Sequence, residues 1–460
     1  MFMGRLRGSG YLAYHLRGQA RYPFRPLATV MRDQSRRVRA MVAYAYRYVP
    51  YYRETLDRLS LRPCDFQSAD DLAQLPLLRT AEYCRDPERF LSTEKPRGTY
   101  LALPTSGSTG LARIIYHDAR GCLQNIAHAE RDRMAVARFL GDPLRYRESV
   151  LTRDGLTSTP HKVQEFCRQH AWFPPYLGIQ RQYLSMFDSL EHNVGELNRF
   201  QPDVIHSIGS YLAELFGYLK RTGVPCHLPR VVTYGSEGVS EAVRRLILED
   251  FGLPLISAYQ ATEAFKLGFE CEQHSGLHLN LDLYPLRVVD TDGKTLPRGE
   301  TGEVVVSNLV NRGTVLLNYH LGDLAALLPD PCPCGRTLPL LSFLRGRARD
   351  FLRFGEGRIV NPWALDRLIC EGQEVWQYQL VQETPTRLRL ALVVPPTCDL
   401  EQTRKRLAAG LAALCGPEVT LELALVERIQ RTAGGKVPPL LAWRPDAEEE
   451  LFRAPARLSD

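Results

Sequence analysis

A run of small and hydroxyl-bearing residues stands out in the first quarter of the chain. It reads Thr-Ser-Gly-Ser-Thr-Gly at residues 105–110. Glycines let backbone N–H groups turn toward one point, and hydroxyls add donors, so the run could surround the oxygens of a phosphate chain. It is not a Walker A loop, because no Gly-Lys-Ser/Thr follows. Taken alone, the run is equally well explained as a solvated turn.

Two acidic segments follow strand-like runs further along the chain. Residues 234–237 are Tyr-Gly-Ser-Glu, and residues 259–263 are Tyr-Gln-Ala-Thr-Glu. Ligands of open α/β sheets bind beyond the carboxyl ends of strands. There an aromatic ring can stack on a base, and a carboxylate can hold Mg²⁺ between phosphates. Each segment is weak evidence by itself, because Tyr and Glu are common near strand ends.

Two further segments near the C-terminus complete the set of polar motifs. Gly322-Asp323 is followed by an arginine-rich stretch at residues 345–350, and Lys436 ends the glycine-rich run Thr-Ala-Gly-Gly-Lys. A lysine in such a loop is usually a surface residue, so the motif gains meaning only together with the others.

The elements that must position these motifs alternate between strand and helix from residue 100 to residue 320. Strands are expected at 204–208, 230–234 and 255–258, with helices at 211–222 and 240–251. This alternation predicts βαβ units and a parallel sheet covered by helices. Residues 286–290 and 302–307 flank Asp292-Gly293, which predicts an antiparallel pair joined by a turn.

The ends of the chain are predicted to differ from this middle part. Residues 1–95 are basic and helical, with apolar residues at helical spacing over 30–59 and an interruption expected at Pro50-Tyr51-Tyr52. The last residues contain strands at 388–394 and 419–426 and a helix at 400–414, enough for a small α+β domain. We therefore predict a large α/β domain over residues 1–348 and a small C-terminal domain over 349–460.

Composition excludes several classes of protein. The 460 residues are 44% hydrophobic and 24% charged, which excludes a mostly disordered chain. The net charge of +6 is a mild excess, and the arginines of residues 32–39 fit a solvated helix face, so no nucleic-acid partner is expected. No apolar run is long enough for a membrane span. Eleven scattered cysteines fit free thiols in a reducing cytoplasm.

In order and spacing, these motifs together resemble those of the AMP-forming adenylate enzymes, the superfamily that includes acyl-CoA synthetases. The similarity is strongest to the phenylacetate–CoA ligase branch, including its coenzyme F390 synthetase-like and capsule-associated relatives, and it runs from about residue 40 to residue 440. Two N-terminal segments are typical of that branch, Val49-Pro50-Tyr51-Tyr52-Arg53 and Leu75-Pro76-Leu77. The resemblance implies a large N-terminal adenylation core and a small mobile C-terminal lid.

The resemblance also implies roles for the motif residues. The ATP β- and γ-phosphates would be surrounded by Thr105, Ser106, Gly107, Ser108, Thr109 and Gly110. The adenine and acyl pockets would be lined by Tyr234, Gly235, Ser236 and Glu237, with Tyr259 stacked on adenine. The remaining roles fall to Thr262 at the α-phosphate, Glu263 on Mg²⁺, Asp323 on both ribose hydroxyls, Arg347 on ribose or phosphate, Arg349 at the hinge, and Lys436 between carboxylate and α-phosphate.

The sequence departs from the superfamily at several of these motifs. The lysine usual after the phosphate loop is absent, and Arg113 could replace it as the phosphate cation. Gln260 stands where glycine is usual, and Arg349 stands where Asp or Lys is usual. These changes could alter rate or acyl specificity without removing the nucleotide site.

The implied reaction is ATP-dependent activation of a carboxylic acid as acyl-AMP, followed by transfer to the thiol of CoA. Its cofactors would be ATP, Mg²⁺ and CoA, and its partners the small-molecule acid and the thiol. The alternative is a stand-alone adenylating enzyme that loads a carrier protein or an amine. A non-catalytic nucleotide-binding protein is disfavoured by the joint presence of Glu263, Asp323 and Lys436. The acid is not identified, an α-amino acid is included among the candidates, and an oligomer is compatible with the sequence.

Cysteine and histidine spacing raises one further possibility. Cys332-Pro333-Cys334 is a tight pair, and Cys271 and His278 precede it, with His274 as the alternate ligand. Three thiolates and one imidazole form a closed tetrahedral zinc set, which indicates a structural role. The segment also resembles one found in zinc-containing relatives of the phenylacetate–CoA ligase branch. The competing interpretation is free thiols on a loop.

Overall fold

The computed structural model describes residues 2–105, 113–142, 144–153, 158–173, 179–344, 346, 351–371, 375–429 and 437–443. By internal contacts the chain divides into two units, each described here by itself. Unit 1 comprises Met1–Glu148, Gly155–Arg181 and Ile256–Leu344, and unit 2 comprises Ser149–Asp154, Gln182–Leu255 and Arg345–Asp460. This division groups the C-terminal residues with 182–255, whereas the boundary at residue 348 stays a prediction.

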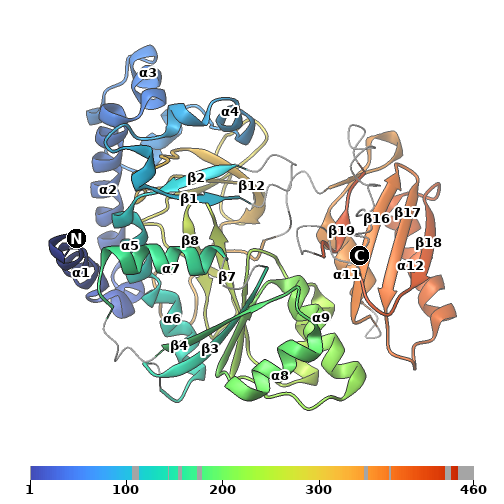
Figure 1. Cartoon of the computed structure of the whole chain (residues 1–460). Coiled ribbons are helices and arrows are strands. Elements are labelled where there is room, and N and C mark those ends of the chain that lie inside the picture. Colours follow the sequence, from blue (N-terminus) through green and yellow to red (C-terminus); the bar gives the residue numbers. More distant parts are fainter. Residues whose placement is uncertain are drawn as a thin grey trace, which may run out of the picture. The chain divides into compact units, whose positions relative to one another are not determined.

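Helices dominate the N-terminal part of unit 1 (Figure 1). They are α1 Phe2–Leu16, α2 Leu27–Tyr48, α3 Pro50–Arg58, α4 Thr80–Arg85, α5 Ala119–His128, α6 Glu130–Val136 and α7 Thr159–His170. The helical spacing expected over 30–59 belongs to two helices that meet at Val49, at the interruption that the sequence predicted beside Pro50. Val49 is extended, and Pro50 begins the next helix, where its missing N–H costs no hydrogen bond.

The strands of unit 1 form antiparallel sheets. One sheet has the order β10-β11-β12, from Leu286–Val289, Thr301–Val306 and Tyr319–Ala326. Four further strands are hydrogen-bonded side by side in the order β13-β9-β8-β7. They are Leu340–Leu341, Leu277–Leu279, Phe265–Glu270 and Leu255–Ala261. A short pair joins β1 Leu101–Pro104 to β2 Ile114–His117. The predicted pairing around Asp292-Gly293 is confirmed, and Gly293 supplies the positive φ of 83° that the turn requires.

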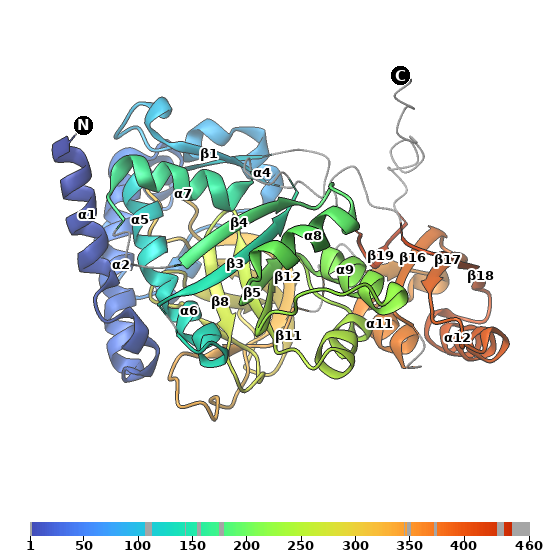
Figure 2. The same ribbon diagram turned by 60° about the horizontal axis from the view of Figure 1, so that its bottom comes forward.

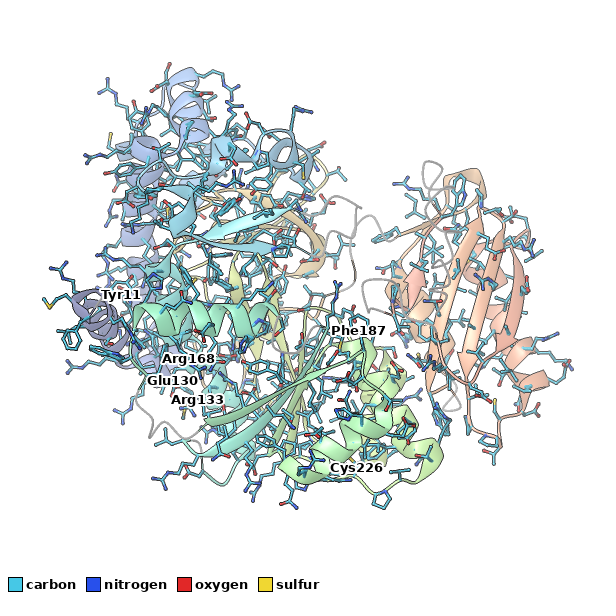
Figure 3. The ribbon with its side chains drawn as sticks, viewed as in Figure 1. Tyr11, Glu130, Arg133, Arg168, Phe187 and Cys226 are labelled. Carbon is cyan, nitrogen blue, oxygen red and sulfur yellow. The ribbon has the colours of Figure 1, made fainter. Side chains whose placement is uncertain are left out.

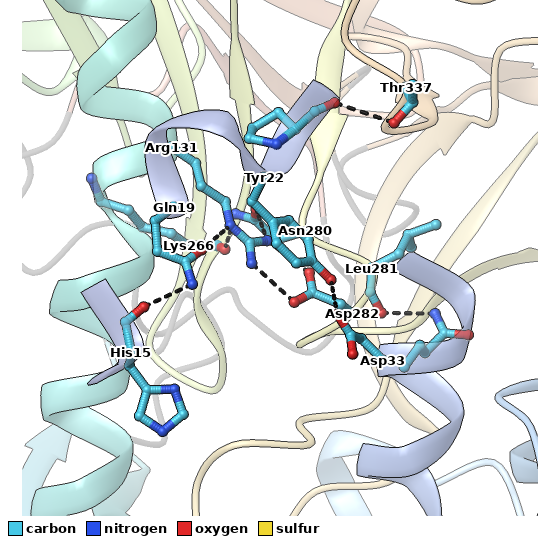
Figure 4. Close-up of polar contacts among 12 residues, drawn as sticks. His15, Gln19, Tyr22, Asp33, Arg131, Lys266, Asn280, Leu281, Asp282 and Thr337 are labelled. Carbon is cyan, nitrogen blue, oxygen red and sulfur yellow. Dashed lines mark hydrogen bonds and ion pairs between the residues drawn. The ribbon is translucent and has the colours of Figure 1, made fainter. Parts of the chain in front are cut away.

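A buried polar network ties the N-terminal segment to the middle of unit 1 (Figure 4). Arg131 of α6 donates two hydrogen bonds to the carboxylate of Asp282, at 2.7 and 2.9 Å, and others to Gln19 and Asn280. Its guanidinium also lies 4.0 Å from the centre of the Tyr22 ring. A buried charge is tolerated only when its partners satisfy it, so this cluster specifies how these segments pack.

Unit 2 contains the predicted βαβ arrangement. Strand β5 Val204–Ser207 leads into helix α9 Gly209–Thr222, which returns to β6 Val231–Gly235, and β5 and β6 pair in parallel. The neighbouring order is β6-β5-β3-β4, with β3 Tyr146–Thr152 and β4 Ile179–Ser185. Helices α8 Leu190–Phe200 and α10 Glu241–Arg245 complete this part, and Leu246–Asp250 continues α10 as a π-helix where an α-helix was expected.

The C-terminal part of unit 2 has its own sheet and core. The sheet order is β18-β17-β16-β19, from Thr420–Leu425, Arg387–Val393, Gln377–Thr384 and Leu440–Leu441. Helices α11 Pro362–Cys370 and α12 Leu400–Cys415 and the pair β14 Leu352–Arg353 and β15 Ile359–Val360 accompany it. Alternate residues of β16 and β17 are buried, as expected for strands with one covered face. The predicted class, a large α/β domain with a parallel sheet and a smaller C-terminal domain, is confirmed.

Among the described residues, no helix combines the length and the apolar character needed to cross a bilayer.

Candidate functional site

A tight hairpin turn presents Thr262 and Glu263. Strands β7 and β8 are antiparallel and pair up to Ala261 and Phe265, so only residues 262–264 form the turn. Phe265 closes it with a φ of +52°, the left-handed conformation that three-residue hairpin loops require. The side-chain amide of Asn308 donates to the Glu263 carbonyl over 2.8 Å. The turn is therefore held in place by the Asn308 side chain as well as by the pairing of its two strands.

Tyr259 lies inside β7, which corrects the expectation that it follows the strand. The strand continues beyond residue 258 because Tyr259 pairs with Gly268 of β8 and Gln260 with Lys266, with a register irregularity between them. A Cβ at Gly268 would lie 2.9 Å from the His278 carbonyl oxygen, so glycine permits close packing of the next strand.

The carboxylate of Glu263 faces a guanidinium. Arg113 and Glu263 form an ion pair of 3.5 Å, with side chains only 13% and 9% exposed. The same Arg113 nitrogen donates to the Tyr319 hydroxyl at 2.6 Å and to the Thr80 hydroxyl at 3.1 Å. Burial, and secondarily the Glu263 charge, raises the pKa of Tyr319 well above its usual value, so its phenol stays protonated. The cluster holds one cation and one anion beside each other in a nearly dry setting.

Asp323 lies at an irregular point of β12. Residue pairing with β11 is interrupted between Glu303 and Val305, where β12 has extra residues, and Gly322 adopts a φ of +78°. Such a bulge changes the direction of the side chain that follows. Asp323, 8% exposed, accepts a hydrogen bond of 2.7 Å from the hydroxyl of Tyr259. The structure thus brings together the two residues predicted for adenine and ribose.

The base of the predicted phosphate loop joins the same cluster. The N–H of Thr105 donates to the carbonyl of Arg113 over 2.7 Å, and the Arg113 N–H lies 3.3 Å from the Thr105 hydroxyl. These bonds extend the β1–β2 pairing and place Arg113 at the far end of the loop. The remaining loop residues, Ser106, Gly107, Ser108, Thr109 and Gly110, lie outside the described residues, as do Arg347, Arg349 and Lys436.

The segment at residues 234–237 belongs to unit 2. It ends β6, where Tyr234 and Gly235 are buried, and Ser236 is exposed with a φ of +66°. Glu237 accepts hydrogen bonds from the hydroxyl and the N–H of Ser210, at 2.6 and 3.3 Å. Ser210 lies in the first turn of α9, where a carboxylate is favoured by the helix dipole. Glu237 is thereby fixed at the carboxyl end of a parallel strand, as the sequence predicted.

Thr80 and Tyr319 are two site residues to which the sequence motifs gave no role. Both side chains contact Arg113, and they also contact each other at 3.1 Å. Thr80 begins α4, shortly after Leu75-Pro76-Leu77, and nothing local distinguishes it from an ordinary helix start. The one sequence signal for this cluster was the missing loop lysine, which suggested Arg113 as the replacement cation.

The cysteine and histidine side chains predicted to bind zinc lie close together. The ligand atoms of Cys271, His278, Cys332 and Cys334 are all within 4.8 Å of one another. Sγ of Cys271 lies 3.6 Å from Sγ of Cys332, and Sγ of Cys334 lies 3.4 Å from Nε2 of His278. Ligands in a tetrahedral zinc site, with bonds of about 2.0–2.3 Å, are separated by roughly 3.3–3.8 Å.

The surroundings of this cluster suit a bound cation. Nδ1 of His278 is 3.3 Å from the Leu338 carbonyl, which leaves Nε2 to face the thiols. Burial raises the pKa of Cys271 and of Cys332, whereas hydrogen bonds from Arg336, including its N–H at 3.4 Å, outweigh burial and lower the pKa of Cys334. The alternate residue His274 is directed elsewhere, because its Nδ1 lies 2.7 Å from the carboxylate of Glu270. Among the described residues, this is the group with metal-binding geometry.

Comparison with known proteins gives consistent relatives. The family model described as the CapK C-terminal domain matches residues 352–439. Phenylacetate–coenzyme A ligase of Thermus thermophilus is 28% identical over 364 residues, covering 76% of this chain and 77% of that protein. The Escherichia coli protein of that name is 28% identical over 337 residues, covering 69% and 71%.

The fold comparison agrees with the sequence comparison. A crystal structure of 2-hydroxyisobutyryl-CoA ligase in the postadenylation state with 2-HIB-AMP superposes with a TM-score of 0.72 and 18% identity, covering 89% of both chains. This likeness concerns the fold, while the similarity in sequence is to phenylacetate–CoA ligases. In sequence the chain is thus similar to phenylacetate–coenzyme A ligases, and in fold it is similar to an acyl-CoA ligase of the adenylate-forming superfamily.

Proposed function

We propose that the protein is an AMP-forming carboxylic acid–CoA ligase. One observation carries the proposal: the β7–β8 hairpin and strand β12 are joined twice by polar contacts. The first contact is the hydrogen bond from Tyr259 to Asp323. The second involves Glu263 and Tyr319, each four residues along the chain from one of these, and both contact the guanidinium of Arg113. The first contact supports a nucleoside site, and the second supports a phosphate and metal site beside it.

The first half-reaction follows from these groups. A carboxylate oxygen attacks the α-phosphorus of ATP, the bond to the β-phosphate oxygen breaks, and acyl-AMP and pyrophosphate result. Asp323 has two oxygens and suits the vicinal ribose hydroxyls. Arg113 is hydrogen-bonded to Thr105, the first residue of the loop, and its guanidinium is paired with Glu263. It would offset phosphate charge in place of the usual lysine. Little covalent chemistry falls to the protein, so positioning and charge neutralisation supply the catalysis.

Magnesium and the remaining loop residues would complete this step. Glu263 is a hard oxygen ligand of the type that Mg²⁺ selects, and the ion would neutralise the triphosphate. Residues 106–110 would contact the β- and γ-phosphates, Thr262 the α-phosphate, and Arg347 the ribose or phosphate. Lys436 would lie between the two anions that must meet. These roles are assigned because the motifs of this chain resemble those of the superfamily.

The second half-reaction is transfer of the acyl group to a thiol. The thiolate of CoA attacks the acyl carbonyl, and AMP leaves with its electron pair. The sequence relatives are phenylacetate–coenzyme A ligases, which favours CoA over a carrier protein as acceptor. Rotation of the C-terminal lid about Arg349 would separate the two half-reactions.

A structural zinc ion is part of the proposal. Cys271, His278, Cys332 and Cys334 would hold it in a closed tetrahedral site without an open position for substrate. The ion would fix the segment after β8 to the loop before β13, at the opposite end of β8 from Glu263. Its contribution would therefore be to stability.

Two assays test the proposed function. Exchange of labelled pyrophosphate into ATP, screened across aryl, fatty, hydroxy and amino acids, identifies the acid that is adenylated. AMP release is then measured with free CoA and with a holo carrier protein as acceptors. Acid-dependent exchange followed by AMP release with CoA is expected. No exchange with any acid contradicts the adenylation reaction, and release only with the carrier protein contradicts the choice of CoA.

A further inference from the structure

The outward face of helix α1 is unusually apolar for a protein surface. Phe2, Met3, Leu6 and Tyr14 are 67%, 60%, 49% and 76% exposed. Their positions, together with Gly10 and Ala13, follow the three- and four-residue spacing of one helical stripe. Seven of the seventeen exposed large apolar side chains of the described residues lie within the first 31 positions. Scattered exposed apolar residues are ordinary, but a concentration of this kind marks an interaction surface.

This face is fixed in place by close packing of the opposite side. A Cβ at Gly8 would lie 2.0 Å from the His170 carbonyl oxygen, so only glycine allows α1 to approach α7 this closely. Ser9 accepts a hydrogen bond of 2.8 Å from the Trp172 N–H, and Leu12 is buried. Tyr11, labelled in Figure 3, bonds Gln124 of α5. The helix therefore cannot rotate to hide its apolar stripe without breaking these contacts.

The charge of the same region is entirely positive. Residues 1–32 contain six arginines and no Asp, Glu or Lys. Within the described part of the chain, none of these arginines forms an ion pair with a carboxylate. Arg7 of α1 is exposed, and so is Arg17, which directly follows the helix. In Figures 1 and 2, α1 lies at the edge of unit 1 near α2, whose first turn exposes Leu27 beside Arg25. Apolar and cationic side chains are thus mixed on one outer surface.

We propose that this surface docks the protein on an anionic lipid membrane. Apolar side chains of an interfacial helix enter the boundary between headgroups and acyl chains, while arginines pair with anionic headgroups. A polyanion such as nucleic acid would satisfy the arginines but leave the apolar stripe in water. An anionic bilayer satisfies both features at once. Docking of this kind places the protein on the membrane surface and requires no spanning segment.

The test is co-sedimentation of the full-length protein with phosphatidylcholine vesicles that contain or lack phosphatidylglycerol. One variant removes apolar side chains (Phe2→Ser, Met3→Ser, Leu6→Ser), and another removes charge (Arg7→Ser, Arg17→Ser). A matched control removes three exposed leucines of unit 2, Leu228, Leu400 and Leu425, which are 41–48% exposed. Circular dichroism and the unfolding temperature establish that each variant is folded.

Binding of the wild-type and control proteins to the anionic vesicles is expected, with little binding to phosphatidylcholine alone. The partition coefficient should fall at least about tenfold in each α1 variant, and added salt should weaken binding of the wild type. The proposal is overturned if the wild type ignores anionic vesicles or if the α1 variants bind as it does. It is also overturned if sedimentation equilibrium shows a wild-type dimer that the apolar variant loses, since a second copy then covers the face.

Discussion

The hydroxyl of Tyr259 donates a hydrogen bond of 2.7 Å to the carboxylate of Asp323. Tyr259 comes from β7, next to the irregularity in its pairing with β8, and Asp323 comes from the irregular part of β12 beside Gly322. The residue proposed to stack on adenine therefore also fixes the carboxylate proposed to bind ribose. Loss of either side chain should disturb the placement of the nucleoside.

Replacing Tyr259 by phenylalanine isolates this bond, because the ring is kept. A hydrogen bond to a charged group contributes about 1.5–3 kcal/mol, so the KM for ATP should rise about tenfold while kcat at saturating ATP changes little. Pyrophosphate exchange at varied ATP gives both constants. Tyr14→Phe, at an exposed position on α1, is the control. An unchanged KM in Tyr259→Phe would show that the bond plays no part in nucleotide binding.

Glutamine at position 263 keeps the shape of the side chain and removes its charge. We expect Glu263→Gln to lower the rate of pyrophosphate exchange by about 10²–10³-fold, the range found for preorganised electrostatic groups. The Mg²⁺ concentration that gives half-maximal exchange should also rise. Glu303→Gln is the matched control, since Glu303 is similarly buried and pairs with His320 instead. An unaltered Mg²⁺ dependence argues against Glu263 as a ligand.

Lys436 can be tested by separating the two half-reactions. Lys436→Ala should lower acid-dependent pyrophosphate exchange by about 10²–10³-fold, because two anions must then approach each other without the ammonium. Thioester formation from supplied acyl-AMP and CoA should remain near the wild-type rate. Lys405→Ala serves as control, since Lys405 lies on the exposed side of α12. Equal loss in both half-reactions would contradict the assigned role.

The zinc site predicts a metal content. The purified protein should contain one zinc ion per chain by atomic emission, and Cys334→Ser should lose it and unfold at a temperature about 5–10 °C lower. Cys64→Ser, at an exposed thiol, should keep both metal and stability. Wild-type protein that holds no zinc after growth with the metal refutes the site, whatever the variants do.

Asp282 links stability to pH. Burial alone would raise its pKa, but the adjacent Arg131 guanidinium overrides this and lowers the pKa of Asp282 to about 2. A carboxylate with a depressed pKa stabilises the fold above its unfolded pKa of about 3.9, and this contribution is lost as pH falls toward 2. Asp282→Asn should cost about 3–5 kcal/mol at neutral pH, because it leaves a buried guanidinium without its counter-ion.

Urea unfolding between pH 7 and pH 2 measures this contribution. The stability difference between wild type and Asp282→Asn should be largest near neutrality and shrink below about pH 4. Asp330→Asn, at an exposed carboxylate, should match the wild type throughout. A difference that is constant down to pH 2 would mean that Asp282 acts through packing and not through charge.

Much of the architecture could be predicted because local periodicity reports which face of an element is buried. The helix expected at 400–414 is α12 at Leu400–Cys415, and the strand at 204–208 is β5 at Val204–Ser207. The extent of β7 could not be predicted, since Tyr259 belongs to the strand only through its pairing with β8. The break at Val49 could be predicted, because a proline follows directly.

The sequence by itself determined the chemistry available to this protein: a hydroxyl-rich loop, carboxylates after strands, and cysteines at metal-binding spacing. Tertiary structure decided which of these groups meet. Arg113 contacts Tyr319 from 206 positions away, and Tyr259 contacts Asp323 from 64 positions away. Periodicity and turn chemistry act over a few residues, whereas such pairings depend on how whole sheets and helices pack, and no local pattern encodes that.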